Sequence, residues 1–239
     1  MRVNWDILKL FILIISVIGL YGFSDYRSDQ RKIEEISINF LGDNNLFIDE
    51  ASVNKLLIQN YGSVKNRTKE QLVLNTIEKV IQSNDMVKKA QIYFTVDGKL
   101  VSKIVQRKPI GRIESASKFY LDDVGKRMPL SKQYSARVPI ITGKITGKTL
   151  EDAYTILNYI NADDFLRKNV IGIHVEEEGN YQLRFRMENF VVNLGGVDNL
   201  NEKFKNFMAF YAKATKDNSL EKYAVVSLEF NNQVVCTKI

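Results

Sequence analysis

The chain has 239 residues, which is enough for two small folded domains beside a membrane segment. A single cysteine, Cys236, excludes an internal disulfide and a thiol-based metal cluster or redox motif, and a single histidine, His174, leaves no histidine pair for catalysis. The net charge of +6 arises from 34 basic and 28 acidic residues scattered along the chain. We therefore expect a solvated surface rather than a binding site for nucleic acid.

The first thirty residues contain an apolar segment that predicts a membrane-spanning helix. Residues 7–23 include one charge, Lys9, and a helix of this length rises about 26 Å, at the short end of what a bilayer core requires. Trp5 and Tyr21 lie near the two ends, where aromatic rings favour the membrane interface.

The charges beside this segment predict its orientation. Positive charge precedes it and net negative charge follows it in residues 25–29, so we expect the N-terminus to stay in the cytoplasm and residues 24–239 to be exported. The alternative is a cleaved signal peptide, with residues 10–20 as its hydrophobic region and a weak small-x-small match at residues 22–24. The predicted parts are a cytoplasmic tail over residues 1–6, a transmembrane helix over residues 7–23 and a polar linker over residues 24–32.

Residues 33–107 predict a small domain with the order β-α-α-β-β. Alternation over residues 33–40 predicts a half-buried strand, and Asp49 is a favourable N-cap for a helix that ends at residues 61–62. Residues 68–71 match a capping box in front of a second helix. The inner side of that helix is expected to carry Val73, Leu74, Ile77, Val80 and Ile81.

A hairpin completes this domain. Strands over residues 87–96 and 100–106 flank Asp97-Gly98, and glycine readily adopts the positive φ that such a turn requires. One face of the first strand is expected to carry Ile92, Phe94 and Val96. The order of elements, directly after an apolar segment, resembles a POTRA domain, a module that docks polypeptide partners outside the cytoplasm.

Residues 108–239 predict a mainly antiparallel β domain with two amphipathic helices, so that the fold class of the whole chain is α+β. Residues 123–125 supply a turn, and Pro139 marks a strand start or a sheet edge. Helical spacing of apolar residues begins near Thr149 and again near Asn199. Further strands are expected over residues 171–175, 181–187, 190–194, 224–230 and 233–237.

Several motifs of this domain occur in a fixed order. They are Arg107-Lys108-Pro109, an Asp-x-x-Gly hairpin at residues 122–125, the strand PIITG at residues 139–143, NLG at residues 193–195 and the block at residues 226–235. This ordered set is similar to the FtsQ/DivIB family of bacterial cell-division proteins, in a form that resembles Bacteroidota-type members. Glu229 departs from the family pattern, in which a basic residue is expected.

The resemblance implies a single-pass protein of the cell inner membrane whose residues 24–239 lie in the periplasm. It implies a non-catalytic scaffold at the division septum that binds FtsB- and FtsL-like proteins, with the FtsB contact on the C-terminal domain and a contribution of the POTRA domain to recruitment. From the residues themselves we expect no cofactor, no small-molecule substrate and no nucleic-acid partner. The alternative is another membrane-anchored POTRA-type transport or assembly factor.

The residues that could suggest catalysis or metal binding have simpler explanations. His174 lies in an alternating strand without a second histidine. The acidic residues 176–178 fit a solvated hairpin tip better than a cation site, and Asp122 and Asp123 fit a turn better than a pair of catalytic acids. We therefore expect no catalytic, metal or cofactor site, which disfavours an anchored periplasmic enzyme.

The last strands suggest how a partner could bind. A C-terminal strand can leave one sheet edge unpaired and offer its main-chain groups to a partner strand. The expected partner-binding residues are Tyr223, Ser227, Glu229, Phe230, Asn232, Gln233, Val234 and Val235. Phe230 is open to two interpretations, because it could anchor the partner or belong to the core on the same strand face as Val226 and Leu228.

Overall fold

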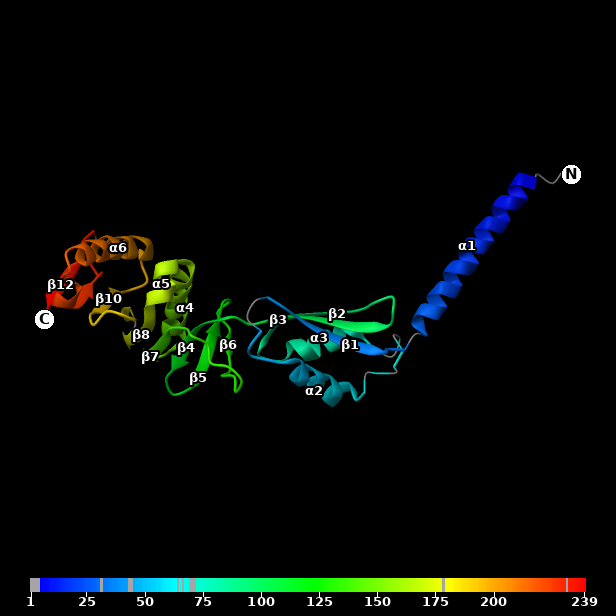
Figure 1. The fold of residues 1–239 in the computed structure, drawn as a ribbon, viewed down its shortest axis with the longest axis horizontal. Helices are drawn as coiled ribbons and strands as arrows, with labels where there is room; N and C mark the ends of the chain where they lie inside the picture. Colours follow the sequence, from blue (N-terminus) through cyan, green and yellow to red (C-terminus); the bar gives the residue numbers. More distant parts are fainter. Residues whose placement is uncertain are drawn as a thin grey trace. The chain divides into compact units, whose positions relative to one another are not determined.

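The computed structural model describes residues 5–30, 32–42, 45–63, 65, 67–68, 72–177, 179–230 and 232–239. The chain divides into two compact units, Met1–Gln106 and Arg107–Ile239 (Figure 1). Each unit has a hydrophobic core of its own. The structure is therefore α+β, with an N-terminal apolar helix, a β-α-α-β-β domain and a mostly β C-terminal domain.

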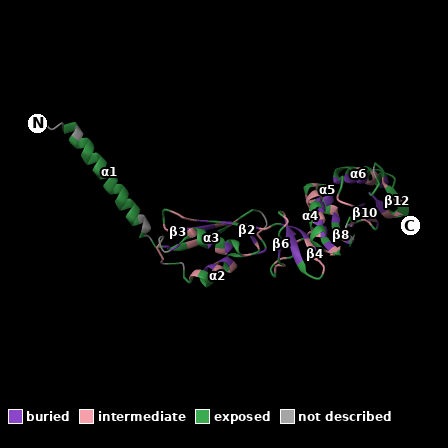
Figure 2. Ribbon diagram, turned by 180° about the vertical axis from the view of Figure 1, so that it is seen from behind, coloured by how far each residue is buried: buried purple, intermediate pink, exposed green. Residues whose placement is uncertain are grey.

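Helix α1 spans Trp5–Asp29 and is exposed along its described length (Figure 2). Its 25 residues correspond to about 38 Å. Residues Leu8–Arg27 are long and apolar enough to cross a membrane. The helix continues six residues beyond the end expected at residue 23, because residues 24–29 contain no glycine or proline and Arg27 favours the negative end of the helix dipole.

The first unit places three strands on two helices. In chain order the elements are β1 (Glu35–Leu41), α2 (Glu50–Tyr61), α3 (Leu74–Gln82), β2 (Val87–Phe94) and β3 (Lys99–Gln106). The sheet order is β1-β3-β2, with β1 parallel to β3 and β2 antiparallel to it. The predicted order β-α-α-β-β is confirmed.

Two local signals in this unit behave as the sequence predicts. The Asp49 carboxylate accepts a hydrogen bond from the Ser52 amide at 2.8 Å, and α2 ends before Gly62, which has a φ of 67°. Gly98, with a φ of 85°, closes the turn between β2 and β3, where the Thr95 amide donates to the Lys99 carbonyl at 2.9 Å. These contacts set the ends of α2 and the register of the hairpin.

The start of α3 differs from the expectation. Residues 69–71 of the predicted capping box lie outside the described residues. Val73 was expected on the inner side of the helix, but it is the N-cap residue and its side chain is 62% exposed. Val96 is also outside the predicted strand face, because β2 ends at Phe94 and Val96 stands in the turn with 88% exposure. Ile77 and Ile81 are buried as predicted.

The second unit contains one nine-stranded sheet in the part of the chain that the structure describes. Its strands are β4 (Pro109–Glu114), β5 (Lys118–Asp122), β6 (Arg127–Met128), β7 (Ile140–Gly143), β8 (Val170–Glu177), β9 (Asn180–Phe185), β10 (Val191–Gly195), β11 (Tyr223–Ser227) and β12 (Val235–Lys238). Its helices are α4 (Gly147–Ala162), α5 (Asp164–Asn169), α6 (Leu200–Lys216) and the 3₁₀ turn η2 (Leu220–Lys222). The short α5 was not predicted.

The strand order is β12-β11-β10-β9-β8-β7-β4-β5-β6. Five neighbouring pairs are antiparallel, and three pairs are parallel: β4 with β7, β7 with β8, and β10 with β11. Parallel neighbours need a crossover connection, which α4 and α5 supply between β7 and β8 and α6 supplies between β10 and β11. Pro139 precedes β7, and β7 lies inside the sheet, so that this proline marks a strand start and not an edge.

One face of this sheet carries the core, and the helices lie on that side (Figure 1). A continuous row of side chains crosses the strands at paired positions, each at most 1% exposed: Ile113, Ile141, Ile173, Leu183, Val192 and Val226. Phe204 and Phe207 of α6 belong to the same core. Burial of these side chains supplies the main favourable free energy of this unit.

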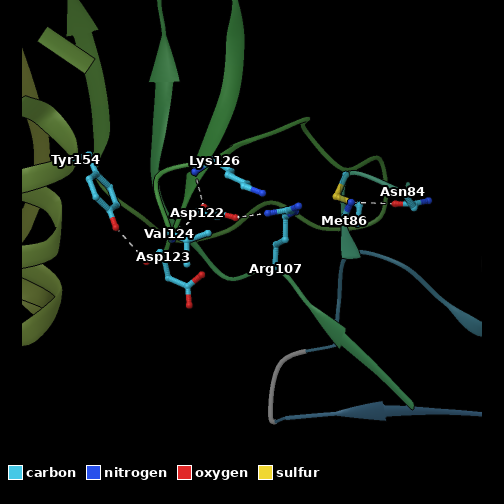
Figure 3. Close-up of polar contacts among 8 residues, drawn as sticks. All are labelled: Asn84, Met86, Arg107, Asp122, Asp123, Val124, Lys126 and Tyr154. Carbon is cyan, nitrogen blue, oxygen red and sulfur yellow. Dashed lines mark hydrogen bonds and ion pairs between the residues drawn. The ribbon is translucent and has the colours of Figure 1, made fainter. Parts of the chain in front are cut away.

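The turn between β5 and β6 is organised by a buried carboxylate (Figure 3). Asp122 is fully buried; its Oδ1 accepts hydrogen bonds from the Val124 and Lys126 amides at 3.0 and 2.7 Å. Its Oδ2 accepts from Arg107 Nη1 at 2.7 Å, and the Arg107 side chain is only 14% exposed. The turn predicted for residues 123–125 is confirmed, and the Asp122 carboxylate is fully used in holding it.

Replacement of Asp122 by alanine should lower the free energy of unfolding of this unit by about 3–5 kcal/mol, because it leaves the Arg107 guanidinium buried without its counter-ion. Urea unfolding of the full chain in detergent measures the effect. Asp164→Ala is the control, since Asp164 pairs with Arg167 on the surface and such pairs contribute about 0–1 kcal/mol. Equal losses in the two variants would contradict this account of the turn.

Candidate protein-binding surface

Strand β12 forms one edge of the nine-stranded sheet. It pairs antiparallel with β11, with Ser227 opposite Val235, Val226 opposite Cys236 and Val225 opposite Thr237. Its other side has no strand beside it among the described residues. This edge is the expected place for a partner to add a strand.

The direction of the main-chain groups on β12 follows from the ladder. The Ile239 amide donates to the Lys222 carbonyl at 3.0 Å, on the β11 side. Because residues alternate along a strand, the polar main-chain groups of Val235 and Thr237 also point toward β11. The N–H and C=O groups of Cys236 and Lys238 therefore point to the open edge.

Three of the eight predicted binding residues are largely occupied within the fold. Tyr223 is half-buried and packs edge-on against Phe210, with ring centroids 5.3 Å apart. Ser227 is 8% exposed, and Val234 packs against the core. These side chains position β11 and the loop after it, and they offer little surface to a partner.

The other five, Glu229, Phe230, Asn232, Gln233 and Val235, are exposed. Phe230 is 49% exposed and Val235 is 42% exposed. The predicted common face holds for Val226 and Leu228 but not for Phe230, because β11 ends at Ser227 and Phe230 follows in the connecting loop. Two partly exposed apolar side chains therefore lie beside the open edge.

Glu229 is held in place by the end of β10. Its Oε2 accepts a hydrogen bond from Ser227 Oγ at 3.2 Å. Its side chain lies over Gly195, where an added Cβ would come within 2.8 Å of Glu229 Cγ. Gly195 also has a φ of 67°. Both the close approach of Glu229 and this left-handed backbone conformation favour glycine at the position. The result is a surface carboxylate with a defined position at the rim of the binding surface.

The connecting loop between β11 and β12 has one conformational constraint. Asn232 has a φ of 59°, a left-handed conformation that asparagine tolerates better than most residues. Asn231, expected to share this turn, lies outside the described residues. A proline at position 232 could not adopt this φ, so a proline test of the edge has to be placed on β12 itself.

Two titratable groups of this unit, Cys236 and Tyr211, are used in packing contacts. Burial raises the pKa of the Cys236 thiol, which lowers its thiolate fraction and reactivity. Burial and a 2.7 Å hydrogen bond to Glu188 raise the pKa of Tyr211 to about 12, so the phenol remains a donor. These contacts stabilise the domain and activate no nucleophile.

His174 and Glu176, which were weighed earlier for catalysis and for cation binding, make hydrogen bonds to neighbouring side chains. His174 Nδ1 lies 2.9 Å from Thr142 Oγ1 on the neighbouring strand. Glu176 accepts hydrogen bonds from Asn180 and Gln182 around the β8–β9 hairpin. Within the described ranges, no group of three histidine, cysteine or acidic residues could hold a metal ion.

Two family models match the chain. The model described as POTRA-like domain matches residues 32–105, and the model described as FtsQ/DivIB, C-terminal related, matches residues 108–237. A search of the curated proteins gave no match. A POTRA-like domain followed by this mostly β domain defines a POTRA-type scaffold of cell division, and the apolar α1 is a candidate single-pass anchor. Since the second model covers more than half of the chain, the chain belongs to the FtsQ/DivIB family, whose members are membrane-associated, non-catalytic scaffolds that act through protein–protein interactions in the divisome.

Sequence reasoning missed two residues of the candidate binding surface. Cys236 and Lys238 offer the outward main-chain groups, yet they were not among the predicted residues. The alternation of residues 233–237 indicates that the N–H and C=O groups of alternate residues point to opposite edges of the strand. Which of the two sets is unpaired depends on the side where β11 lies, and this is a tertiary property.

Truncation of Phe230 and Leu228 to alanine should separate the two interpretations of Phe230. Leu228 is 2% exposed, so Leu228→Ala should cost about 2–5 kcal/mol of unfolding free energy. Phe230→Ala should cost less than about 1 kcal/mol, because much of its side chain is already in water. Thermal or urea unfolding measures both. A loss at Phe230 as large as that at Leu228 would assign Phe230 to the core.

Proposed function

We propose that this chain is a bitopic division scaffold that binds and recruits FtsB- and FtsL-like proteins at the septum without catalysing a reaction. The observation that carries the proposal is the edge strand β12, with exposed Phe230 and Val235 beside it in a domain of the FtsQ/DivIB family. A partner segment adds to β12 as a further strand. The POTRA-like domain contributes to recruitment.

Strand addition at β12 uses main-chain and side-chain contacts together. The outward N–H groups of Cys236 and Lys238 donate, and their C=O groups accept, only a few hydrogen bonds with a partner strand, each with a net contribution of about 0.5–1.5 kcal/mol. Burial of Phe230 and Val235 adds apolar contact at about 25 cal/mol per Å² of surface removed from water. The backbone sets the register of the partner, and the two apolar side chains select its residues.

The shortness of β12 limits unwanted pairing. It has four residues, and Lys238 places a charge on it. Short edge strands and lysine side chains are devices by which proteins prevent edge-to-edge aggregation. The edge is therefore suited to a partner that brings additional contacts to Phe230, and poorly suited to another copy of the same edge.

The proposed topology has the N-terminus in the cytoplasm, α1 in the inner membrane and the two domains in the periplasm. Arg2 and the N-terminus place positive charge before the apolar stretch, and Lys9 lies near its start. Helix α1 continues unbroken through residues 22–24, which supports a retained anchor over a cleaved signal peptide. The anchor holds both domains near the membrane in which small membrane-bound partners are embedded.

Cys236→Pro should reduce capture of the FtsB-like partner at least about tenfold, because proline removes one outward N–H and its ring obstructs the incoming strand. Cys236→Ala is the matched control, since it deletes the thiol and keeps the N–H, and it should bind normally. Co-purification of the tagged full chain with the FtsB-like protein measures the difference, after unfolding curves show that both variants fold. Equal binding by the two variants would exclude strand addition at β12.

A fluorescent fusion to the N-terminus of the full chain should concentrate at the division septum, because a divisome scaffold has to act there. Time-lapse microscopy of dividing cells measures the ratio of septal to lateral signal. The Cys236→Pro fusion is the control for partner dependence. Uniform labelling of the envelope by the unchanged chain would contradict the function and favour a transport or assembly factor.

A further inference from the structure

The end of the POTRA-like domain that adjoins α1 carries two exposed valines. Val96 is 88% exposed in the β2–β3 turn, and Val73 is 62% exposed at the N-cap of α3. Leu74, next to Val73, lines the same hollow as Thr95 and Val96. The two valines therefore belong to one end of the domain.

Neither valine is explained by its local structure. Turn positions favour glycine, asparagine, aspartate and serine, and N-cap positions favour side chains that accept a hydrogen bond from the helix. Val96 follows Thr95 in a turn closed by Gly98, and Val73 makes no side-chain cap contact. A single exposed apolar side chain needs no explanation, but two of them occur here where polar residues are expected.

The chain holds this end close to the membrane. The Glu34 amide donates to the Gly98 carbonyl at 3.2 Å, so the start of β1 is fixed to the turn that carries Val96 (Figure 1). Helix α1 ends at Asp29, and the five residue steps from Asp29 to Glu34 reach at most about 18 Å. The six helical residues 24–29 add about 9 Å. The Glu34–Gly98 contact and the two residue steps from Gly98 to Val96 add about 12 Å. Val96 is thus tethered within about 40 Å of the apolar end of α1.

We infer that Val96 and Val73 insert into the lipid interface of the membrane that α1 spans and form a second membrane contact. The inference rests on the proposed anchoring role of α1. The occupant is the boundary between headgroups and acyl chains, since this is the apolar surface within reach of the tether. Lys32, exposed beside this turn at Gly98, reaches the lipid phosphates while the valines enter the acyl boundary.

Tryptophan fluorescence of the full chain in lipid nanodiscs tests the contact, because Trp5 is the one tryptophan of the sequence. In discs of phosphatidylcholine and phosphatidylglycerol with brominated acyl chains, Trp5 of the unchanged protein reports whether α1 is inserted. In a Trp5→Phe background, Val96→Trp should lose emission relative to discs without bromine. Val124→Trp is the matched control, since Val124 stands in a similar turn of the second unit with 48% exposure and should keep its emission.

A second variant tests whether the native Val96, and not the introduced tryptophan, causes the insertion. With Val73→Trp as reporter in the same background, Val96→Asp should shift the ratio of inserted to free states about tenfold toward the free state, and the bromine effect should fall accordingly. Suppose that bromine quenches Trp5 of the unchanged protein. The inference is then overturned if Val96→Trp emits equally in discs with and without bromine, or if Val96→Asp does not reduce the quenching of the Val73→Trp reporter. Failure of the lipid to quench Trp5 would instead overturn the anchor.

Discussion

The parallel pairing of β10 with β11 is the constraint on which the C-terminal domain depends. Two consecutive parallel strands cannot be joined by a hairpin, so the chain must cross over one face of the sheet. Helix α6 makes this crossing, and it brings Phe204 and Phe207 onto the buried row that ends at Val226. The next strand then has one free position, beside β11. The same crossover thus completes the core and places β12 at the edge.

Local signals in the sequence predicted the turns and helix ends well. Asp49, Gly98 and the Asp122 turn act through neighbours within four residues, so their roles can be derived without tertiary information. Val73 and Val96 were placed wrongly by periodicity. Helix α3 begins one residue after Val73 and strand β2 ends two residues before Val96, so neither side chain lies on a face of the regular element.

The final strand was predictable from the sequence, but the arrangement of the sheet edge that it forms was not. The alternating residues near the end of the chain indicate a strand, and the ordered motifs indicate the family. The three parallel pairings, however, bring together strands that are separated by helices or hairpins, and no local pattern specifies them. Whether Tyr223 packs inward, and which main-chain groups of β12 remain available, follows from that pairing alone.

The four-residue length of β12 has a consequence for how tightly a partner has to bind. A soluble ligand would need a long interface, since it loses all its translational freedom on binding. In the function proposed above, the partner is embedded in the same membrane and has already lost one dimension of movement, so that less binding free energy is needed to hold it. A modest intrinsic affinity would then fill the site.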